Sequence, residues 1–161
     1  MISRIRRNHG LEHATLHALS KRFPHRNIAG YSDPFGFWIV GDLPTETVAE
    51  VVLEALGRMK AGEKNLAVHP YCGTNFLTTG TLAGMAGALA MLGAGKRWRD
   101  KLERLPLAVG LATLAVILSQ PLGFLLQSRI TTSGEPGDLQ VAEIHRQQQG
   151  CFTAHRVLTR G

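Results

Sequence analysis

Two long stretches without charged residues constrain most strongly what this chain can fold into. Residues 73–95 and residues 105–126 contain no Lys, Arg, Asp or Glu. A helix of about 20 apolar residues spans the ~30 Å hydrocarbon core of a bilayer, and each stretch is long enough to do so. Residues 96–104, which separate the two stretches, contain five basic side chains and Trp98, a composition typical of a loop at a membrane surface. The pattern predicts a transmembrane helical hairpin.

The rest of the chain is polar and basic. Nearly all acidic side chains lie in residues 1–70 and 128–161, and the formal net charge is +6. A charge of this sign suits nucleic acid or an anionic membrane surface, and the apolar middle favours the lipid bilayer as the partner, with no nucleic acid. Cys72 and Cys151 are too few for a disulfide framework, so we expect reduced thiols. No segment resembles a cleavable signal peptide.

Hydrophobic periodicity outside the apolar stretches predicts an α+β fold. Apolar residues recur at helical spacing in two segments, and β-branched and aromatic residues flank turn-forming residues in two others. The predicted elements are a helix over residues 3–22, a hairpin of strands 27–32 and 36–41, a helix over residues 44–60, and a second hairpin of strands 139–146 and 151–158.

These elements group into three parts. Residues 1–70 form a soluble N-terminal part, residues 71–127 the transmembrane hairpin, and residues 128–161 a β-hairpin that packs with the N-terminal part. We expect the two β-hairpins to join in one small sheet, on which the two N-terminal helices pack. Gly80 and Gly84 lie one helical turn apart and allow a close helix contact, either with the second span or with another copy in a homo-oligomer.

A histidine stripe on the first helix is the main candidate for chemistry. His9, His13 and His17 are spaced four apart, so a helix places them on one face, and Glu12 borders that face. His9-x-x-Glu12-His13 is the H-x-x-E-H order of inverted zincins, in which two histidines bind a metal and the carboxylate acts as a base. The alternative is a solvated helix face that carries His and Glu without a metal.

A second cluster lies where the soluble part meets the first span. His69 and Cys72 have a spacing at which an imidazole and a thiolate can reach one zinc ion. Cys72 precedes the apolar helix, whose N-terminal dipole lowers the pKa of a thiol there. Three interpretations of Cys72 stay open: a metal ligand, a structural cysteine and a nucleophile.

Four other side chains with metal-binding chemistry have simpler explanations. Glu50 and Glu54 are four apart on the second helix, which is typical of a solvated face, although one of them could be a carboxylate ligand. His145 and His155 lie in the C-terminal hairpin, where we expect surface positions.

The two clusters together resemble a known family. The chain carries the blocks His9-Gly10-Leu11-Glu12-His13 and His69-Pro70-Tyr71-Cys72-Gly73-Thr74-Asn75-Phe76. These resemble blocks of the YqhQ-like bacterial membrane proteins, which are predicted metal-dependent enzymes. The chain departs from that pattern in residues 27–60, inserted between the blocks, and in Asn75, where Ser is usual. The whole chain also resembles an uncharacterised family of small bacterial membrane proteins. The resemblance implies that both blocks belong to one site.

The predicted function is a membrane-anchored metal-dependent hydrolase. His9, His13, His69 and Cys72 are the candidate ligands of one divalent ion, zinc by ligand type, with iron and manganese as alternatives. Glu12 is the predicted general base for a water activated by the metal, and His17 supports the ligands or transfers protons. The expected substrate is an amide or ester, such as a membrane-proximal polypeptide, which a hairpin edge could bind by strand addition.

Ligand number separates this hydrolase from a second hypothesis. Four protein ligands close a zinc site, whereas a catalytic site keeps one position open. Catalysis therefore requires that His69 or Cys72 does not bind. The alternative function is a non-catalytic membrane scaffold or assembly protein with a structural metal.

The expected location is the cytoplasmic (inner) membrane, crossed by two spans. The basic loop over residues 96–104 favours a cytoplasmic loop. Translocation of a basic N-terminal part without a signal is the harder event. We therefore expect both termini and the site on the cytoplasmic side.

Overall fold

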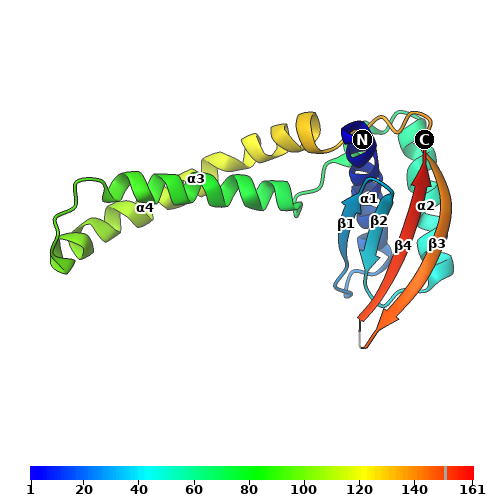
Figure 1. Cartoon of the computed structure of the whole chain (residues 1–161), viewed down its shortest axis with the longest axis horizontal. Coiled ribbons are helices and arrows are strands. Elements are labelled where there is room, and N and C mark those ends of the chain that lie inside the picture. Colours follow the sequence, from blue (N-terminus) through cyan, green and yellow to red (C-terminus); the bar gives the residue numbers. More distant parts are fainter. Residues whose placement is uncertain (151) are drawn as a thin grey trace. The chain divides into compact units, whose positions relative to one another are not determined.

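The chain divides into two compact units, shown in the computed structural model of Figure 1. The structure describes residues 1–150 and 152–161. Residues 1–69 and 128–161 form the first unit, and residues 70–127 form the second. The first unit is therefore assembled from segments on both sides of the second unit in the sequence.

The first unit combines two α-helices with a four-stranded antiparallel sheet, which confirms the α+β class and the single sheet (Figure 1). Its strands lie in the order β1-β2-β4-β3, so both hairpins stay intact and β2 pairs with β4. Cys151, predicted to begin the last strand, lies outside the described residues. The elements are α1 (Ile2–Arg22), β1 (Ala29–Asp33), β2 (Gly36–Val40), α2 (Thr45–Lys60), the 3₁₀ helix η1 (Lys64–Ala67), β3 (Gln140–Gln149) and β4 (Phe152–Arg160).

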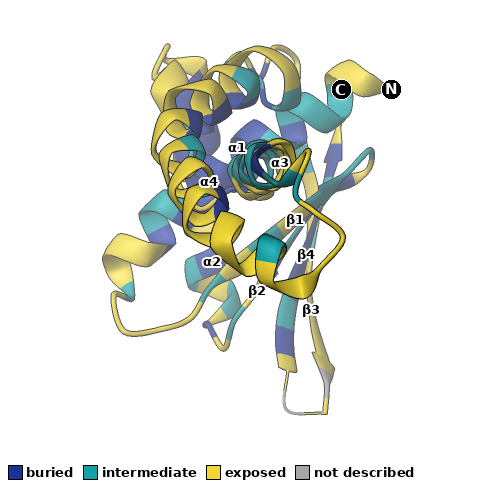
Figure 2. Ribbon diagram, turned by 90° about the vertical axis from the view of Figure 1, so that its left-hand side faces the viewer, coloured by how far each residue is buried: buried dark blue, intermediate teal, exposed yellow. Residues whose placement is uncertain are grey.

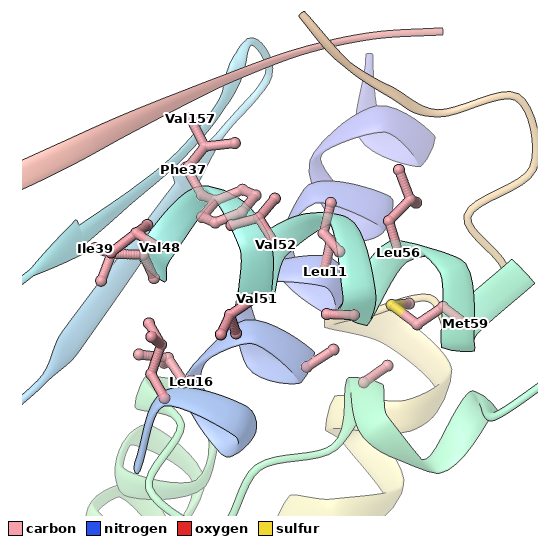
Figure 3. Close-up of a cluster of buried hydrophobic side chains, with 14 of the residues drawn as sticks. Leu11, Leu16, Phe37, Ile39, Val48, Val51, Val52, Leu56, Met59 and Val157 are labelled. Carbon is pink, nitrogen blue, oxygen red and sulfur yellow. The ribbon is translucent and has the colours of Figure 1, made fainter. Parts of the chain in front are cut away.

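An apolar core between the helices and the sheet holds the first unit together (Figure 3). Alternate residues of a strand point to the same face, and Phe37, Ile39 and Val157 on β2 and β4 point into the core. Leu11 of α1 is fully buried beside them. The predicted apolar stripe of α2 is buried as well; it consists of Val48, Val51, Val52, Ala55, Leu56 and Met59.

A close backbone approach at Gly10 fixes the segment after the second unit against α1. A side-chain carbon at Gly10 would overlap the carbonyl oxygen of Ser133. Next to this contact, the Ser133 N–H donates to the carbonyl of Arg6 over 2.9 Å, and the Arg6 guanidinium donates to the carbonyl of Thr132. Residues 131–133 are thereby held beside the histidine-bearing part of α1.

The second unit is a hairpin of two helices, α3 (Gly73–Met91) and α4 (Trp98–Leu126). The Thr79 and Ser119 hydroxyls form a hydrogen bond of 2.8 Å between them. Within the described residues, Gly80 and Gly84 have no atom near the position of an added side chain, so they do not form the α3–α4 contact. The homo-oligomer that they could support stays a prediction.

α4 begins inside the segment predicted as a loop. The helix starts at Trp98, within residues 96–104, whereas we expected it from residue 105. The Asp100 carboxylate accepts the N–H of Arg97 over 3.3 Å, so it satisfies a backbone donor that the helix start leaves open. This local cap explains why the helix extends into charged sequence.

Of the described helices, one is long and apolar enough to cross a membrane. It runs through Trp98–Thr131, with a mean hydropathy of 1.9, and only 11% of its most apolar segment is buried. Figure 2 shows α4 largely in the colour of exposed residues. α3 does not meet the same criterion because Thr, Gly and Asn interrupt its apolar residues. Of the two predicted spans, only the second thus has the length and hydropathy of a membrane span among the described residues. Membrane location stays a prediction.

Candidate metal centre

A buried polar face of α1 carries the predicted H-x-x-E-H residues. Glu12 and His13 are almost completely buried, and His9 and His17 are half-buried. The His9 and His13 rings contact each other edge to face, with centroids 4.4 Å apart. Burial of this kind is unusual for charged or polar helix residues without a role in structure or chemistry. The solvated-face alternative is therefore wrong for His13 and Glu12.

Backbone carbonyls orient the first two histidine rings. His9 Nδ1 lies 3.0 Å from the Thr131 carbonyl oxygen, and His13 Nδ1 lies 2.7 Å from that of Ala67. A carbonyl oxygen only accepts, so Nδ1 carries the proton in both rings and Nε2 carries the lone pair. This is the arrangement found in metal-binding histidines, whose second nitrogen donates to a carbonyl or carboxylate.

His17 and His69 extend the pair into a cluster of four imidazoles within the first unit. The His69 ring centroid lies 5.6 Å from that of His13 and 4.6 Å from that of His17. His17 Nε2 bonds to the Val68 carbonyl over 2.8 Å, so its lone pair is on Nδ1. We call His9, His13, His17 and His69 the histidine cluster.

The histidine cluster changes the ionisation of His69. Its burial, and the nearness of His17 and His13, lower the pKa of His69 to about 4 from its ordinary value of 6.5. His69 is therefore neutral at neutral pH, the state in which an imidazole can bind a metal or accept a proton.

We expect the metal-free protein to lose stability as the pH falls from about 6.5 towards 4. In that window the unfolded state binds a proton at His69 that the folded state excludes, so the free energy of unfolding rises with pH. The contribution is about 1–2 kcal/mol once solvent screening is allowed for. Denaturant unfolding at pH 7.5 and pH 4.5 measures it. The His69→Gln variant should show a smaller difference, and an equal difference would contradict the assignment.

Glu12 points to the sheet, where its carboxylate contacts two residues of β1. The Ser32 hydroxyl donates a hydrogen bond to Glu12, and a side chain at Gly30 would overlap the carboxylate. Sequence reasoning missed both residues. Their signal was weak: small side chains at alternate positions of a short strand, Gly30 and Ser32, leave room on one face for a neighbour.

Cys72 lies near the start of the second unit, at the start of α3. It is buried, precedes the first residue of α3, and its sulfur accepts the N–H of Thr74 over 3.5 Å. The predicted helix-start position is therefore confirmed. His9, His13 and Cys72 supply a His₂Cys donor set that could hold a metal ion. His69 and Glu12 are not in that set.

The remaining sequence candidates lie apart from the histidine cluster. Glu50 and Glu54 are exposed and pair with Arg22, as expected for a solvated helix face. His145 is exposed and pairs with Glu143. The expected surface position is wrong for His155, which is fully buried, because β4 lies in the centre of the sheet.

The fold and the histidine cluster define an α+β protein with a helical hairpin inserted in its sequence and a buried group of metal-ligand side chains. The chain belongs to the family described as Domain of unknown function (DUF6391), whose model matches residues 4–144. It is 35% identical over 153 residues to an uncharacterized protein of the cyanobacterium Picosynechococcus sp., across 87% of this chain and 71% of the relative. No solved structure matches. The expectation of an uncharacterised family is confirmed.

Proposed function

We propose that this protein is a membrane-anchored, metal-dependent hydrolase acting on amide or ester bonds. One observation carries the proposal: His9 and His13, one helical turn apart on α1, both donate Nδ1–H to backbone carbonyls. The lone pair of each ring is therefore on Nε2, the nitrogen that would bind a metal. Two imidazoles fixed in this way form half of a zinc site before any metal binds.

The ligand set that we propose is His9, His13 and Cys72. Their donor types suit one divalent ion, with zinc first by ligand type and iron or manganese as alternatives. Three protein ligands keep the fourth position open, as catalysis requires. His69 then supports the cluster beside His17 and does not close the site.

Glu12 is the proposed general base. Glu12 lies between His9 and His13 in the sequence of α1. The Ser32 hydroxyl of β1 donates a hydrogen bond to the Glu12 carboxylate. A bound metal would supply a Lewis acid and lower the pKa of a water. Glu12 would remove the proton of the attacking water and later pass it to the leaving group. A peptide bond close to the bilayer is the substrate class that we favour.

The exposed apolar surface of α4 supports the membrane anchor. Leu107, Leu114 and Leu118 are each about half exposed or more. A contiguous apolar surface of this length is stable in lipid and unfavourable in water.

A structural metal is the second candidate, favoured by the same hydrogen bonds. His9 and His13 tie α1 to Thr131 and Ala67, so a metal on these rings would also brace two connecting segments. In that case the protein is a membrane scaffold without turnover.

Elemental analysis of detergent-purified protein, combined with a peptide hydrolysis assay, tests the proposal. We expect one metal per chain, hydrolysis that a chelator stops, and recovery on return of zinc. Metal without hydrolysis would support the scaffold, and protein that binds no metal would refute both.

A further inference from the structure

One edge strand of the sheet in the first unit contacts Glu12 of α1. In the order β1-β2-β4-β3, the edge strands are β1 and β3, and among the described residues β1 pairs with β2 alone. β1 is also the strand that holds Glu12, through Ser32 and Gly30. A chain segment added beside β1 would therefore run past the proposed base.

The register shows which backbone groups of β1 face outward. The Gly41 N–H donates to the Thr153 carbonyl, and the Thr159 N–H donates to the Phe35 carbonyl. The odd-numbered residues of β2 therefore form their backbone hydrogen bonds with β4. The even-numbered residues of β2 consequently bond towards β1, where they meet its odd-numbered residues. The N–H and C=O groups of Gly30 and Ser32 then point away from β2, to the free edge.

The helix geometry places His13 on the other side of Glu12 from the core residue Leu11. Successive residues turn by about 100° around a helix, so Leu11 and His13 flank Glu12 in opposite directions. Leu11 lies in the core with Phe37 of β2 (Figure 3), which fixes its direction as the interior of the sheet. His13 therefore lies on the other side of Glu12 from Leu11, where the Ala67 carbonyl accepts its Nδ1–H. A strand added beside β1 would lie about 4.8 Å from it.

The two edges differ in how well they suit an added strand. β1 presents the small, uncharged residues Gly30 and Ser32 at its outward positions. β3 carries Glu143, His145 and Arg146, and charges on an edge strand oppose pairing with another chain.

We infer that β1 binds an extended polypeptide segment as a fifth strand, paired through the backbones of Gly30 and Ser32. The pairing would place alternate peptide carbonyls beside the strand that contacts Glu12. It deepens the proposed function and rests on it for the identity of the site, since it names an unfolded or extended polypeptide as the substrate. Main-chain pairing gives little selectivity for side chains, so we expect broad sequence tolerance.

Amide hydrogen exchange on the full chain in detergent tests the inference without turnover. The protein is freed of metal by a chelator, and the probe is the peptide acetyl-Lys-Thr-Val-Thr-Val-Thr-Lys-amide at saturating concentration. We expect exchange at Gly30 and Ser32 to slow more than tenfold. Tyr31, already bonded to β2, is the internal control and should change little. A peptide of the same sequence with every amide N-methylated cannot pair and should protect neither residue.

The outcomes separate this inference from the hydrolase. Protection of Gly30 and Ser32 in a protein that hydrolyses nothing would keep the strand addition and refute the hydrolase. Hydrolysis by a protein whose β1 amides stay unprotected would keep the hydrolase and overturn the inference. Equal protection at Ile144, an outward residue of β3, would also overturn it, because the pairing would then be unselective.

Discussion

Replacing His13 by Ala is expected to strip the metal from the purified protein. The change removes a ligand whose Nδ1–H is already fixed by the Ala67 carbonyl. Loss of an outer partner alone typically costs about 10–100-fold in metal affinity, so loss of the ligand itself should exceed that range. Elemental analysis should fall from about one metal per chain to near zero, measured alongside His9→Ala.

An exposed histidine provides the matched control. His145 pairs with Glu143 on β3 and lies outside the histidine cluster, so His145→Ala should keep its full metal content. Circular dichroism checks that the His13 variant folds, and His13→Gln, which keeps a polar side chain, is the second variant should His13→Ala unfold. Full metal in folded His9 and His13 variants would end the metal-site proposal.

Glu12→Gln is expected to leave the metal in place and to reduce hydrolysis. Gln keeps the size of Glu and an oxygen for the Ser32 hydroxyl, but it cannot take a proton at neutral pH. General-base catalysis typically contributes about 10²–10⁴-fold, which sets the expected fall in kcat. The assay uses equal amounts of metal-loaded wild type and variant.

Two further variants show whether a fall in kcat is specific to Glu12. Glu50→Gln changes an exposed carboxylate on α2 and should leave kcat unaltered. Ser32→Ala removes the hydrogen bond to Glu12 and should lower kcat less than Glu12→Gln does. Unchanged kcat in Glu12→Gln would exclude Glu12 as the base, and a loss of metal there would make Glu12 a ligand or its support.

Most elements could be predicted because their signals are local. The leucines of α1, the valines of α2 and the Pro-containing turn of the first hairpin each determine structure within a few residues. The predicted start of the second apolar helix lies too late in the chain, because the charges of residues 96–104 are typical of a loop, whereas Asp100 caps a helix start. The burial of His155 depends on the strand order, which the periodicity of a single strand does not contain.

The candidate site could be predicted only in part, for a similar reason. The four-residue spacing of His9 and His13 follows from the helix, so their shared face was evident from sequence. The groups that orient them are carbonyls of Thr131 and Ala67, and every residue type carries a carbonyl. Contacts between distant segments, such as Ser32 with Glu12, leave no spacing pattern in the chain.

The position of β4 in the sheet determines the order in which parts of the first unit can fold during synthesis. β4 lies between β2 and β3, although β2 ends at Val40 and β4 begins only at Phe152. At a synthesis rate of about 5–20 residues per second, roughly ten seconds separate these two strands on the ribosome. α3 and α4 are synthesised during that interval, so the helical hairpin can form while the sheet still lacks a central strand. The histidines of α1 are therefore synthesised well before the sheet that supports them is complete, so the metal binding proposed above would follow the synthesis of β4.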